Sequence, residues 1–278
     1  MVQRVALLKI SKAYRTSPTI ALNVFLGVPP LHVVAKGLYI KFQIWFNRNN
    51  NYDFININNL DHFVKINNID LKHRVIEFPV SVENADYDVY TDGSGIDRNV
   101  GAAVCKFKDD ILVKSFMFKL SSFNSVFQAQ LAAINFAACW DLENSYRINI
   151  FSDSLSSIQI LKKSNSKSFY INNIKNKMFQ ALGSVGLSWL KAHAGIPGNE
   201  LADHYAKTAI LEGEELSVSA PYSFFKKHIN TYTLNSWQRH WEGSRRGLRV
   251  SDFVPLVKFN LLTHNRFLFP DMVLFLLI

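Results

Sequence analysis

Residues 87–120 have the sequence YDVYTDGSGIDRNVGAAVCKFKDDILVKSFMFKL, and their pattern decides the fold class. The first part, YDVYTDGS, is a short β-run that ends in a polar turn, where Gly93 and Gly95 let the chain bend without a Cβ penalty. The second part predicts two strands joined at Asp109 and Asp110, a turn-forming pair between two apolar runs. We therefore expect the sheet to begin with three consecutive antiparallel strands.

Helices and strands alternate after this start. The stretch NSVFQAQLAAINFAA, which begins at residue 124, has apolar residues at Phe127, Leu131, Ile134 and Ala138, the spacing of one packed helix face. The following elements are a strand in YRINIFSDS, helices in SLSSIQILKK and SFYINNIKNKMFQALG, a strand in VGLSWLKAH and a helix in GNELADHYAKTAILEG. This order predicts an α/β protein whose later strands are parallel.

Three acids belong to these elements. Asp92 closes the first predicted strand, Asp153 closes another, and Asp203 lies on the last helix. Asp92 and Asp153 meet beyond the carboxyl ends of their strands if those strands are neighbours. Convergent carboxylates need a cation, and hard oxygen ligands suit Mg²⁺ or Mn²⁺. Each acid taken alone is more often a turn residue or a helix cap, so only the set supports a functional hypothesis.

The motifs YTDGS, FQAQLAAI, FSDS and WLKAHAGIPGNELADHYAK resemble, in this order and at these gaps, the type 1 ribonuclease H family. The gaps are 38 residues from Asp92 to Gln130, 23 from there to Asp153, and 50 from there to Asp203. The resemblance covers roughly residues 86–212, and HAGIPGNELAD is its most specific part. It implies a ribonuclease H-like α/β fold, a five-stranded mixed sheet with three antiparallel strands first and helices on its flanks.

The resemblance also implies an activity, the endonucleolytic hydrolysis of the RNA strand of an RNA–DNA hybrid by a mechanism that uses two Mg²⁺ ions. Mn²⁺ is the expected substitute. Asp92, Asp153 and Asp203 match the metal-binding carboxylates of the family. His193 matches its mobile histidine, which assists proton transfer or product release. The implied catalytic set is Asp92, Gln130, Asp153, His193 and Asp203.

Gln130 departs from the family, which has a metal-binding Glu at this position. Glutamine keeps an acceptor oxygen but carries no charge. One charge about 4 Å from a cation is worth on the order of 4 kcal/mol at an effective dielectric near 20. Losing half of that weakens metal binding more than tenfold, since about 1.4 kcal/mol is a factor of ten. The predicted helix around Gln130 contains no acid that replaces the missing charge, so we expect impaired activity.

The chain divides into four predicted parts. Residues 1–50 are helical, and QRVALLKISKAYRTSPTIALNVFLGVPPL resembles the segment after the reverse transcriptase of arthropod-type non-LTR retrotransposon polyproteins. Residues 51–84 form an Asn-rich linker, and 85–213 form the ribonuclease H domain. Residues 214–278 form a helical tail that resembles the segment after that domain, although its end, LLTHNRFLFPDMVLFLLI, suggests truncation. The resemblance implies the C-terminal piece of such a polyprotein, since the chain has no room for a polymerase.

The charge distribution suits a polyanionic partner, here an RNA–DNA hybrid. The formal charge is +9. Net charges of +5 for residues 1–84, +1 for 85–213 and +3 for 214–278 make both flanks basic. Ordinary solubilising lysines explain the charge equally well. Candidate contacts to the nucleic-acid backbone are Asn124, Lys162, Lys163, Lys167, Lys175 and Lys177. The alternatives are a solvated helix face for the lysines and a helix N-cap for Asn124.

Several classes of protein are disfavoured. Cys105 and Cys139 are too few for a disulfide framework or a zinc site. We find no signal peptide and no apolar run long enough for a membrane span, so an intracellular protein of the cytoplasm or nucleus is expected, with no protein partner evident. Three alternatives to an active ribonuclease remain: a catalytically silent hybrid- or duplex-binding module, a relic without function, and a DDE-type integrase, which GNELADHYAK disfavours.

Overall fold

The structure is a computed structural model, and it describes residues 2–70, 74–164 and 166–259. The chain divides into two compact units, which are described separately. One unit, here called the helical unit, joins Met1–Ile57 to Phe225–Ile278, and the other, the sheet unit, is Asn58–Phe224. The predicted truncated end, residues 261–278, lies outside the described residues.

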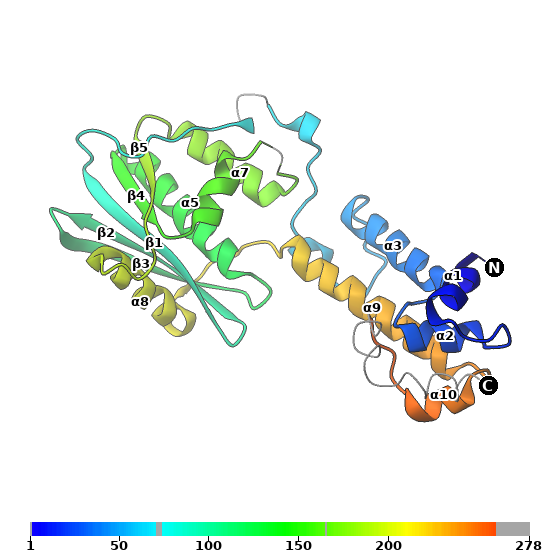
Figure 1. Cartoon of the computed structure of the whole chain (residues 1–278). Helices are drawn as coiled ribbons and strands as arrows, with labels where there is room; N and C mark the ends of the chain where they lie inside the picture. The colour runs from blue at the N-terminus through cyan, green and yellow to red at the C-terminus, as the bar shows by residue number, and fades with distance from the viewer. Residues whose placement is uncertain (1, 71–73, 165, 260–278) are drawn as a thin grey trace. The chain divides into compact units, whose positions relative to one another are not determined.

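The sheet unit contains a mixed six-stranded sheet in the order β5-β4-β1-β2-β3-β6 (Figure 1). The first three strands are antiparallel neighbours, whereas β4 is parallel to β1 and β5 is parallel to β4. The predicted mixed sheet is therefore confirmed. The sixth strand was not expected, because two residues carry no periodic pattern. The strands are β1 (Tyr87–Ile96), β2 (Asn99–Lys108), β3 (Ile111–Leu120), β4 (Ile148–Ser152), β5 (Val185–Trp189) and β6 (Glu214–Glu215).

Strand β1 is longer than the sequence predicts. It passes through YTDGS and ends at Ile96, where the β1–β2 hairpin begins. The expected turn at Gly93 and Gly95 was wrong, because both glycines are paired strand residues without positive φ. Their small size serves packing instead. A Cβ on Gly93 would lie 2.7 Å from the backbone nitrogen of Gln130, so glycine allows the helix that carries Gln130 to approach the strand.

The predicted turn at Asp109 and Asp110 is confirmed. Both residues have positive φ, 48° and 62°, as a type I′ hairpin turn requires.

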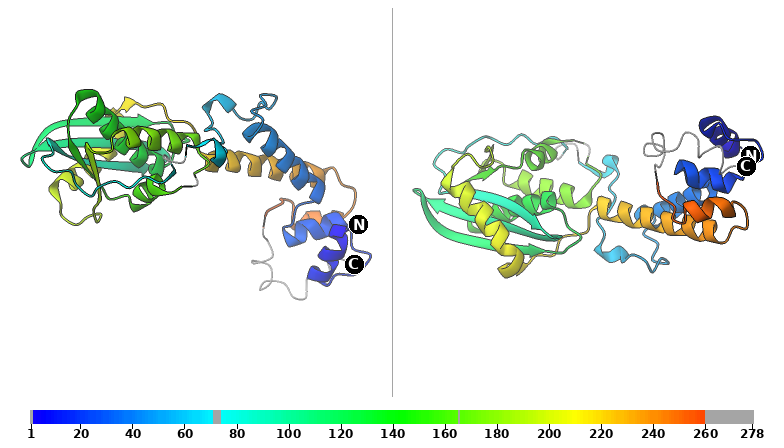
Figure 2. Two further views of the ribbon diagram at one scale, coloured as in Figure 1. Left: turned by 90° about the horizontal axis from the view of Figure 1, so that it is seen from above. Right: turned by 60° about the horizontal axis from the view of Figure 1, so that its bottom comes forward.

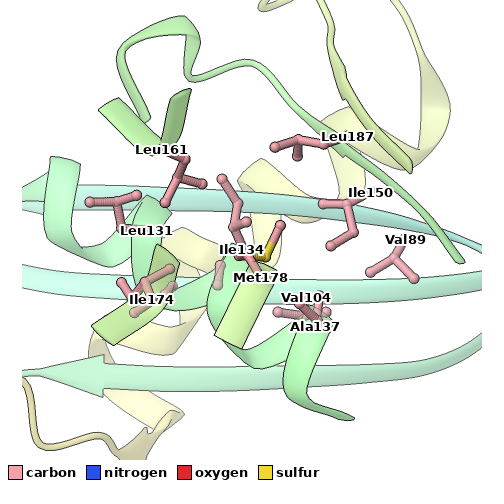
Figure 3. Packing of buried hydrophobic residues seen from close by; sticks show 14 of the residues in the cluster. Val89, Val104, Leu131, Ile134, Ala137, Ile150, Leu161, Ile174, Met178 and Leu187 are labelled. Carbon is pink, nitrogen blue, oxygen red and sulfur yellow. The ribbon is translucent and has the colours of Figure 1, made fainter. Parts of the chain in front are cut away.

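Helices cover both faces of the sheet (Figure 2). Helices α5, α6 and α7 pack on one face, where Leu131, Ile134 and Met178 meet Val104 and Ile150 of the strands (Figure 3). Helix α8 packs on the other face, where a Cβ on Gly101 would strike the Ala206 carbonyl oxygen. The helices are α5 (Val126–Asn144), α6 (Leu155–Lys162), α7 (Phe169–Gln180) and α8 (Pro197–Glu212).

The segment before β1 is not the loosely ordered linker that its asparagines suggest. Leu60 and Phe63 form isolated bridges with residues 220 and 168. The Asp61 carboxylate accepts hydrogen bonds from the Ser168 hydroxyl and the Tyr170 backbone N–H. Ile76 and Phe78 are buried in the core. Sparse apolar residues therefore attach residues 58–84 to the sheet unit, although the segment has no helical or strand period. Residues 71–73 lie outside the described residues.

The helical unit joins the two ends of the chain. Its core contains Leu7 and Leu22 from the N-terminal helices and Trp237 and Trp241 from α9. The predicted N-terminal helices are confirmed, and the second ends at Gly27 in a left-handed cap. The two flanks, treated as separate segments on sequence grounds, thus share one core. The helices are α1 (Val2–Ser11), α2 (Thr19–Leu26), α3 (Leu31–Trp45), α9 (Tyr222–Glu242) and α10 (Leu248–Phe253).

Within the described residues, no individual helix is both long and apolar enough to cross a bilayer. Helices α2 and α3, which bend by 63° at their junction, meet the length and composition criteria only as a pair.

Replacing Trp237 tests whether the two flanks depend on one core. Trp237 is fully buried, so we expect Trp237→Ala to destabilise the helical unit by about 3–5 kcal/mol. Urea unfolding followed by circular dichroism measures this change. Phe253→Ala is the matched control, because that ring is 60% exposed, and its cost should be under about 0.5 kcal/mol. Equal effects of the two changes would contradict a shared core.

Candidate active site

The pairing of β1 with β4 brings two acids together. The last pair in their parallel register is Thr91 with Ser152. Asp92 and Asp153 are the next residues on each strand. Neighbouring strands lie roughly 4.8 Å apart, so the two carboxylates leave the backbone side by side, as the sequence predicted. Asp203 approaches them from α8, and it acts electrostatically on both.

The electrostatics of this cluster show close carboxylates without a compensating cation. Burial, together with the nearby charges of Asp153 and Asp203, raises the pKa of Asp92 to about 7. Hydrogen bonds from the Gly93 backbone N–H and the Gln130 side chain oppose this rise. Burial also raises the pKa of Asp153, again with help from Asp203. A bound cation would remove this penalty, which is the property of a metal site.

Gln130 lies at this cluster, as the sequence predicted. It is the fifth residue of α5, its side chain is half-buried, and it hydrogen-bonds to Asp92. Two features hold the helix start in place. Ser125 and Gln128 form a capping box, and Gly93 allows the backbone at Gln130 to approach β1 closely. The neutral amide therefore stands beside the buried carboxylate.

His193 and Glu200 lie at the exposed side of the cluster. One ligand atom each from His193, Glu200 and Asp203 falls within 4.8 Å of the others, a separation that suits a shared cation. His193 is on a loop with a left-handed backbone, φ 52°, and its side chain is 74% exposed. The role of His193 in proton transfer or product release stays a prediction. Sequence reasoning missed Glu200, because an acid in a first helical turn is usually assigned to the helix dipole.

Lys207 is the second residue that sequence reasoning missed. Its Nζ atom lies 2.6 Å from Asp203 Oδ2 and donates a hydrogen bond to it. The Asp203 hydrogen bond raises the pKa of Lys207, with smaller contributions from Asp92 and Glu200. An Asp and a Lys four residues apart on a helix were a visible signal for this pair. The Lys207 ammonium group therefore occupies the Asp203 oxygen that would otherwise be available to a metal ion.

Asn199 is a third unpredicted residue. Its side chain is buried and hydrogen-bonds to Asp153, which lowers the pKa of that carboxyl against the effect of burial. Its Oδ1 atom has no hydrogen-bond partner among the described residues. The amide therefore orients Asp153 from the first turn of α8. Nothing in the sequence beyond its place in GNELAD indicated this function.

The predicted backbone contact Asn124 is buried between two elements. Its amide nitrogen donates to the carbonyl oxygens of Val218 and Ser219, each at 3.2 Å. The alternative interpretation as an N-cap was wrong, because Ser125 caps α5. Binding of nucleic acid by Asn124 stays a prediction, and it requires release of this amide.

The predicted lysine cluster divides into two groups. The Lys175 side chain is 1% exposed, and its Nζ donates to the carbonyl oxygens of Arg74 and Lys163 at 2.7 and 2.6 Å. It is a structural cation, so its prediction as a phosphate contact was wrong. Lys177 is half-buried near Cys139. The exposed members, whose binding role stays a prediction, are Lys162, Lys163 and Lys167.

Part of the chain is similar to known proteins. Residues 84–211 match the family model for RNase H. Similar solved structures include the prototype foamy virus protease–reverse transcriptase, with 18% identity over 49% of this chain and 22% of that one, at a TM-score of 0.40. The chain thus spans about a fifth of that protein. No curated protein matched the chain.

Two further solved structures cover isolated domains. The RNase H domain of the foamy virus PFV has 17% identity over 45% of this chain and 94% of that one, at a TM-score of 0.39. RNase H1 from Halobacterium salinarum NRC-1 has 14% identity over 45% and 96%, at a TM-score of 0.38.

The raised pKa of Asp92 predicts a pH-dependent stability. A carboxyl with a folded-state pKa above its unfolded value stabilises the fold fully below the unfolded pKa, here 3.8, and loses that contribution as pH rises through about 7. Without metal, Asp92→Asn should therefore stabilise the protein at pH 8 by on the order of 2–4 kcal/mol and leave it unchanged near pH 4.

Chemical denaturation in EDTA at both pH values measures this difference. Glu143→Gln removes one exposed charge from α5 and serves as the control, with little effect expected at either pH. An equal loss of stability at both pH values in Asp92→Asn would contradict the assignment.

Proposed function

Because residues 84–211 match the family model for RNase H, we propose that this chain hydrolyses the RNA strand of an RNA–DNA hybrid endonucleolytically. The observation that carries the proposal is the convergence of Asp92, Asp153 and Asp203 at the edge of the β1–β4 pair. A buried carboxyl such as Asp92, whose pKa is raised by burial and by neighbouring carboxylates, marks a candidate functional site. The proposed substrate is a hybrid, since the family acts on that class.

The residues at this cluster fit divalent metal ions. Asp92, Asp153 and Asp203 would hold them through carboxylate oxygens, the ligands that Mg²⁺ prefers, and Gln130 offers one neutral oxygen. We propose two Mg²⁺ ions, with Mn²⁺ as a substitute. Bound there, they would neutralise the carboxylates, lower the pKa of an attacking water and stabilise the charge of the reacting phosphate.

The chain's own residues supply orientation and proton transfer. Asn199 and Gly93 hold the two strand carboxylates through hydrogen bonds, so these ligands are oriented before substrate binds. His193, exposed on its loop and 4.0 Å from Glu200, assists proton transfer at the leaving oxygen or release of the product. The lysines at 162, 163 and 167 are proposed to contact the nucleic-acid backbone.

Two features favour a second function, a catalytically silent hybrid- or duplex-binding module. Gln130 removes one negative charge, and Lys207 adds a positive charge at Asp203. Both lower the attraction of the cluster for cations. This alternative predicts binding without cleavage even at high Mn²⁺ concentration, with an affinity that falls steeply as salt rises.

We also propose that the chain derives from the C-terminal part of a non-LTR retrotransposon polyprotein. The support is that the two stretches with this resemblance, one in each flank, share one hydrophobic core around Trp237. Two segments that fold together are expected to have been acquired and kept together. The prediction of a relic without function is tested by expression of the intact chain.

Restoring the carboxylate at position 130 should raise activity. We expect Gln130→Glu to cleave a labelled hybrid at least tenfold faster at limiting Mg²⁺, because it adds a negative charge beside the metal ligands. Asn135→Asp is the matched control, since it adds the same charge farther along α5. Equal rates for wild type and Gln130→Glu would show that three Asp suffice or that Gln130 does not contact the metals.

Removing the competing lysine should strengthen metal binding. Lys207→Gln frees Asp203 Oδ2, and we expect an affinity for Mn²⁺ about 1.4- to fivefold higher, the range for an exposed ion pair worth about 0.2–1 kcal/mol. Electron paramagnetic resonance of free Mn²⁺ measures this without substrate. Lys191→Gln is the control, because Lys191 has no ion pair among the described residues and should leave the affinity unchanged. A weaker affinity in Lys207→Gln would contradict the competition.

A further inference from the structure

The positive charge of the chain is concentrated in one unit. The helical unit, Met1–Ile57 with Phe225–Ile278, contains 15 Lys and Arg against 4 Asp and Glu, a net charge of +11. The sheet unit, Asn58–Phe224, contains 16 against 18, a net charge of −2. The candidate catalytic unit is therefore slightly acidic and has little long-range attraction for a polyanion. The helical unit has that attraction.

A cavity of about 730 Å³ opens within the helical unit, a size in the range of about 300–1,000 Å³ that is usual for ligand sites. Its basic lining comes from both flanks of the chain. Arg4 and His32 belong to the N-terminal part, and His240 and Arg246 belong to the C-terminal part. Hydroxyl groups of Thr16 and Thr19 add donors, and no carboxylate lines the cavity among the described residues.

Arg4 is fixed at the wall of this cavity. Its guanidinium donates to the Ser17 carbonyl oxygen and to Thr19 Oγ1, each at 2.8 Å, and to the Arg15 carbonyl oxygen. These acceptors are neutral, and no described carboxylate forms an ion pair with Arg4. The positive charge is therefore oriented but not neutralised. An immobilised guanidinium with uncompensated charge is suited to an anion such as phosphate.

Two further groups face the same cavity. The rings of His32 and His240 lie edge to face, with centroids 4.8 Å apart, so two imidazoles contribute donors from opposite flanks. Helix α2 begins beside them, with Pro18 as its N-cap and no side chain that caps its first N–H groups. Ile20 in that first turn lines the cavity. The N-terminal dipole of the helix and its open N–H groups favour a negative ligand.

We propose that this cavity binds a phosphate group of a nucleic-acid strand, so that the helical unit is the anchoring site of the chain. The charge difference between the units favours nucleic acid over a free phosphate metabolite, because a strand presents many phosphates to a surface of net charge +11. The inference does not depend on cleavage by the sheet unit. A chain that cannot hydrolyse a hybrid would still bind through the helical unit.

Binding of the whole chain in EDTA tests this proposal, because metal-dependent contacts at the candidate active site are then absent. Fluorescence anisotropy with a labelled single-stranded RNA measures affinity, and inorganic pyrophosphate is the competitor. Arg246→Gln removes an exposed lining charge whose guanidinium forms no hydrogen bond among the described residues, since only the backbone of Arg246 bonds to Ser244. Arg249→Gln is the matched control, since Arg249 is exposed on α10 and does not line the cavity.

We expect Arg246→Gln to weaken RNA binding at least fivefold and Arg249→Gln to weaken it less than twofold. Pyrophosphate should displace RNA from the wild type but much less effectively from Arg246→Gln. Equal losses in the two variants would overturn the proposal in favour of diffuse surface charge. Binding of pyrophosphate without binding of RNA would assign the cavity to a free phosphate ligand.

The same preparations distinguish this result from the proposed ribonuclease activity. Asp92→Asn should abolish hybrid cleavage in Mg²⁺ and leave RNA binding in EDTA within twofold of the wild type. A loss of RNA binding in Asp92→Asn equal to that in Arg246→Gln would overturn the separate site. Intact RNA binding in a chain that shows no cleavage would contradict the proposed activity alone.

Discussion

The parallel pairing of β1 with β4 is the interaction on which the candidate site depends. It places Asp92 beside Asp153, one residue beyond the last paired residues. The Asp153 charge adds to the effect of burial in raising the pKa of Asp92, and burial raises the pKa of Asp153. The repulsion between the two carboxylates does not stabilise the fold. The pairing of β1 with β4 is retained because the hydrophobic core beneath it stabilises both strands. Burial of the core thus offsets the unfavourable repulsion between the carboxylates, and a bound cation would reduce that repulsion.

Close packing of α5 against β1 sets the chemistry of this site. Glycine at position 93 permits the approach, and the capping box at Ser125 fixes where the helix begins. This geometry places Gln130 within hydrogen-bonding distance of Asp92. On the other side, α8 delivers Asp203 together with Lys207 and Asn199. The same two helices therefore provide candidate metal ligands, an orienting amide and a competing cation.

The two units differ in their charge. The sheet unit contains the clustered carboxylates and has a net charge of −2, whereas the helical unit contains all of the excess positive charge. Carboxylates that attract cations also repel the phosphate backbone of a substrate. A basic unit on the same chain would offset this repulsion without placing more cations beside the candidate metal ligands. The alternative is a cation close to the carboxylates. Lys207 shows the disadvantage of that arrangement, because its ammonium group forms an ion pair with Asp203.

The sequence by itself determined the local features and the order of the elements. Apolar periodicity predicted the α5 helix and the strands. Asp109 and Asp110 predicted a hairpin turn, and both have the positive φ values that Asp tolerates better than most residues. The motif spacing identified four of the residues at the site, Asp92, Gln130, Asp153 and Asp203. The predicted elements are confirmed because they rest on contacts between residues near in sequence, whereas the catalytic and metal-binding roles of these four residues stay predictions.

Tertiary structure alone decided the rest. Lys175 looks like any surface lysine in sequence, but backbone carbonyls 101 and 12 residues away bury its charge. Gly93 looks like a turn glycine, but the helix that passes over it keeps it in a strand. The sequence indicates two separate flanking segments, but in the structure both contribute to one hydrophobic core that contains Trp237. In each case the decisive partner is distant along the chain, and no local pattern records it.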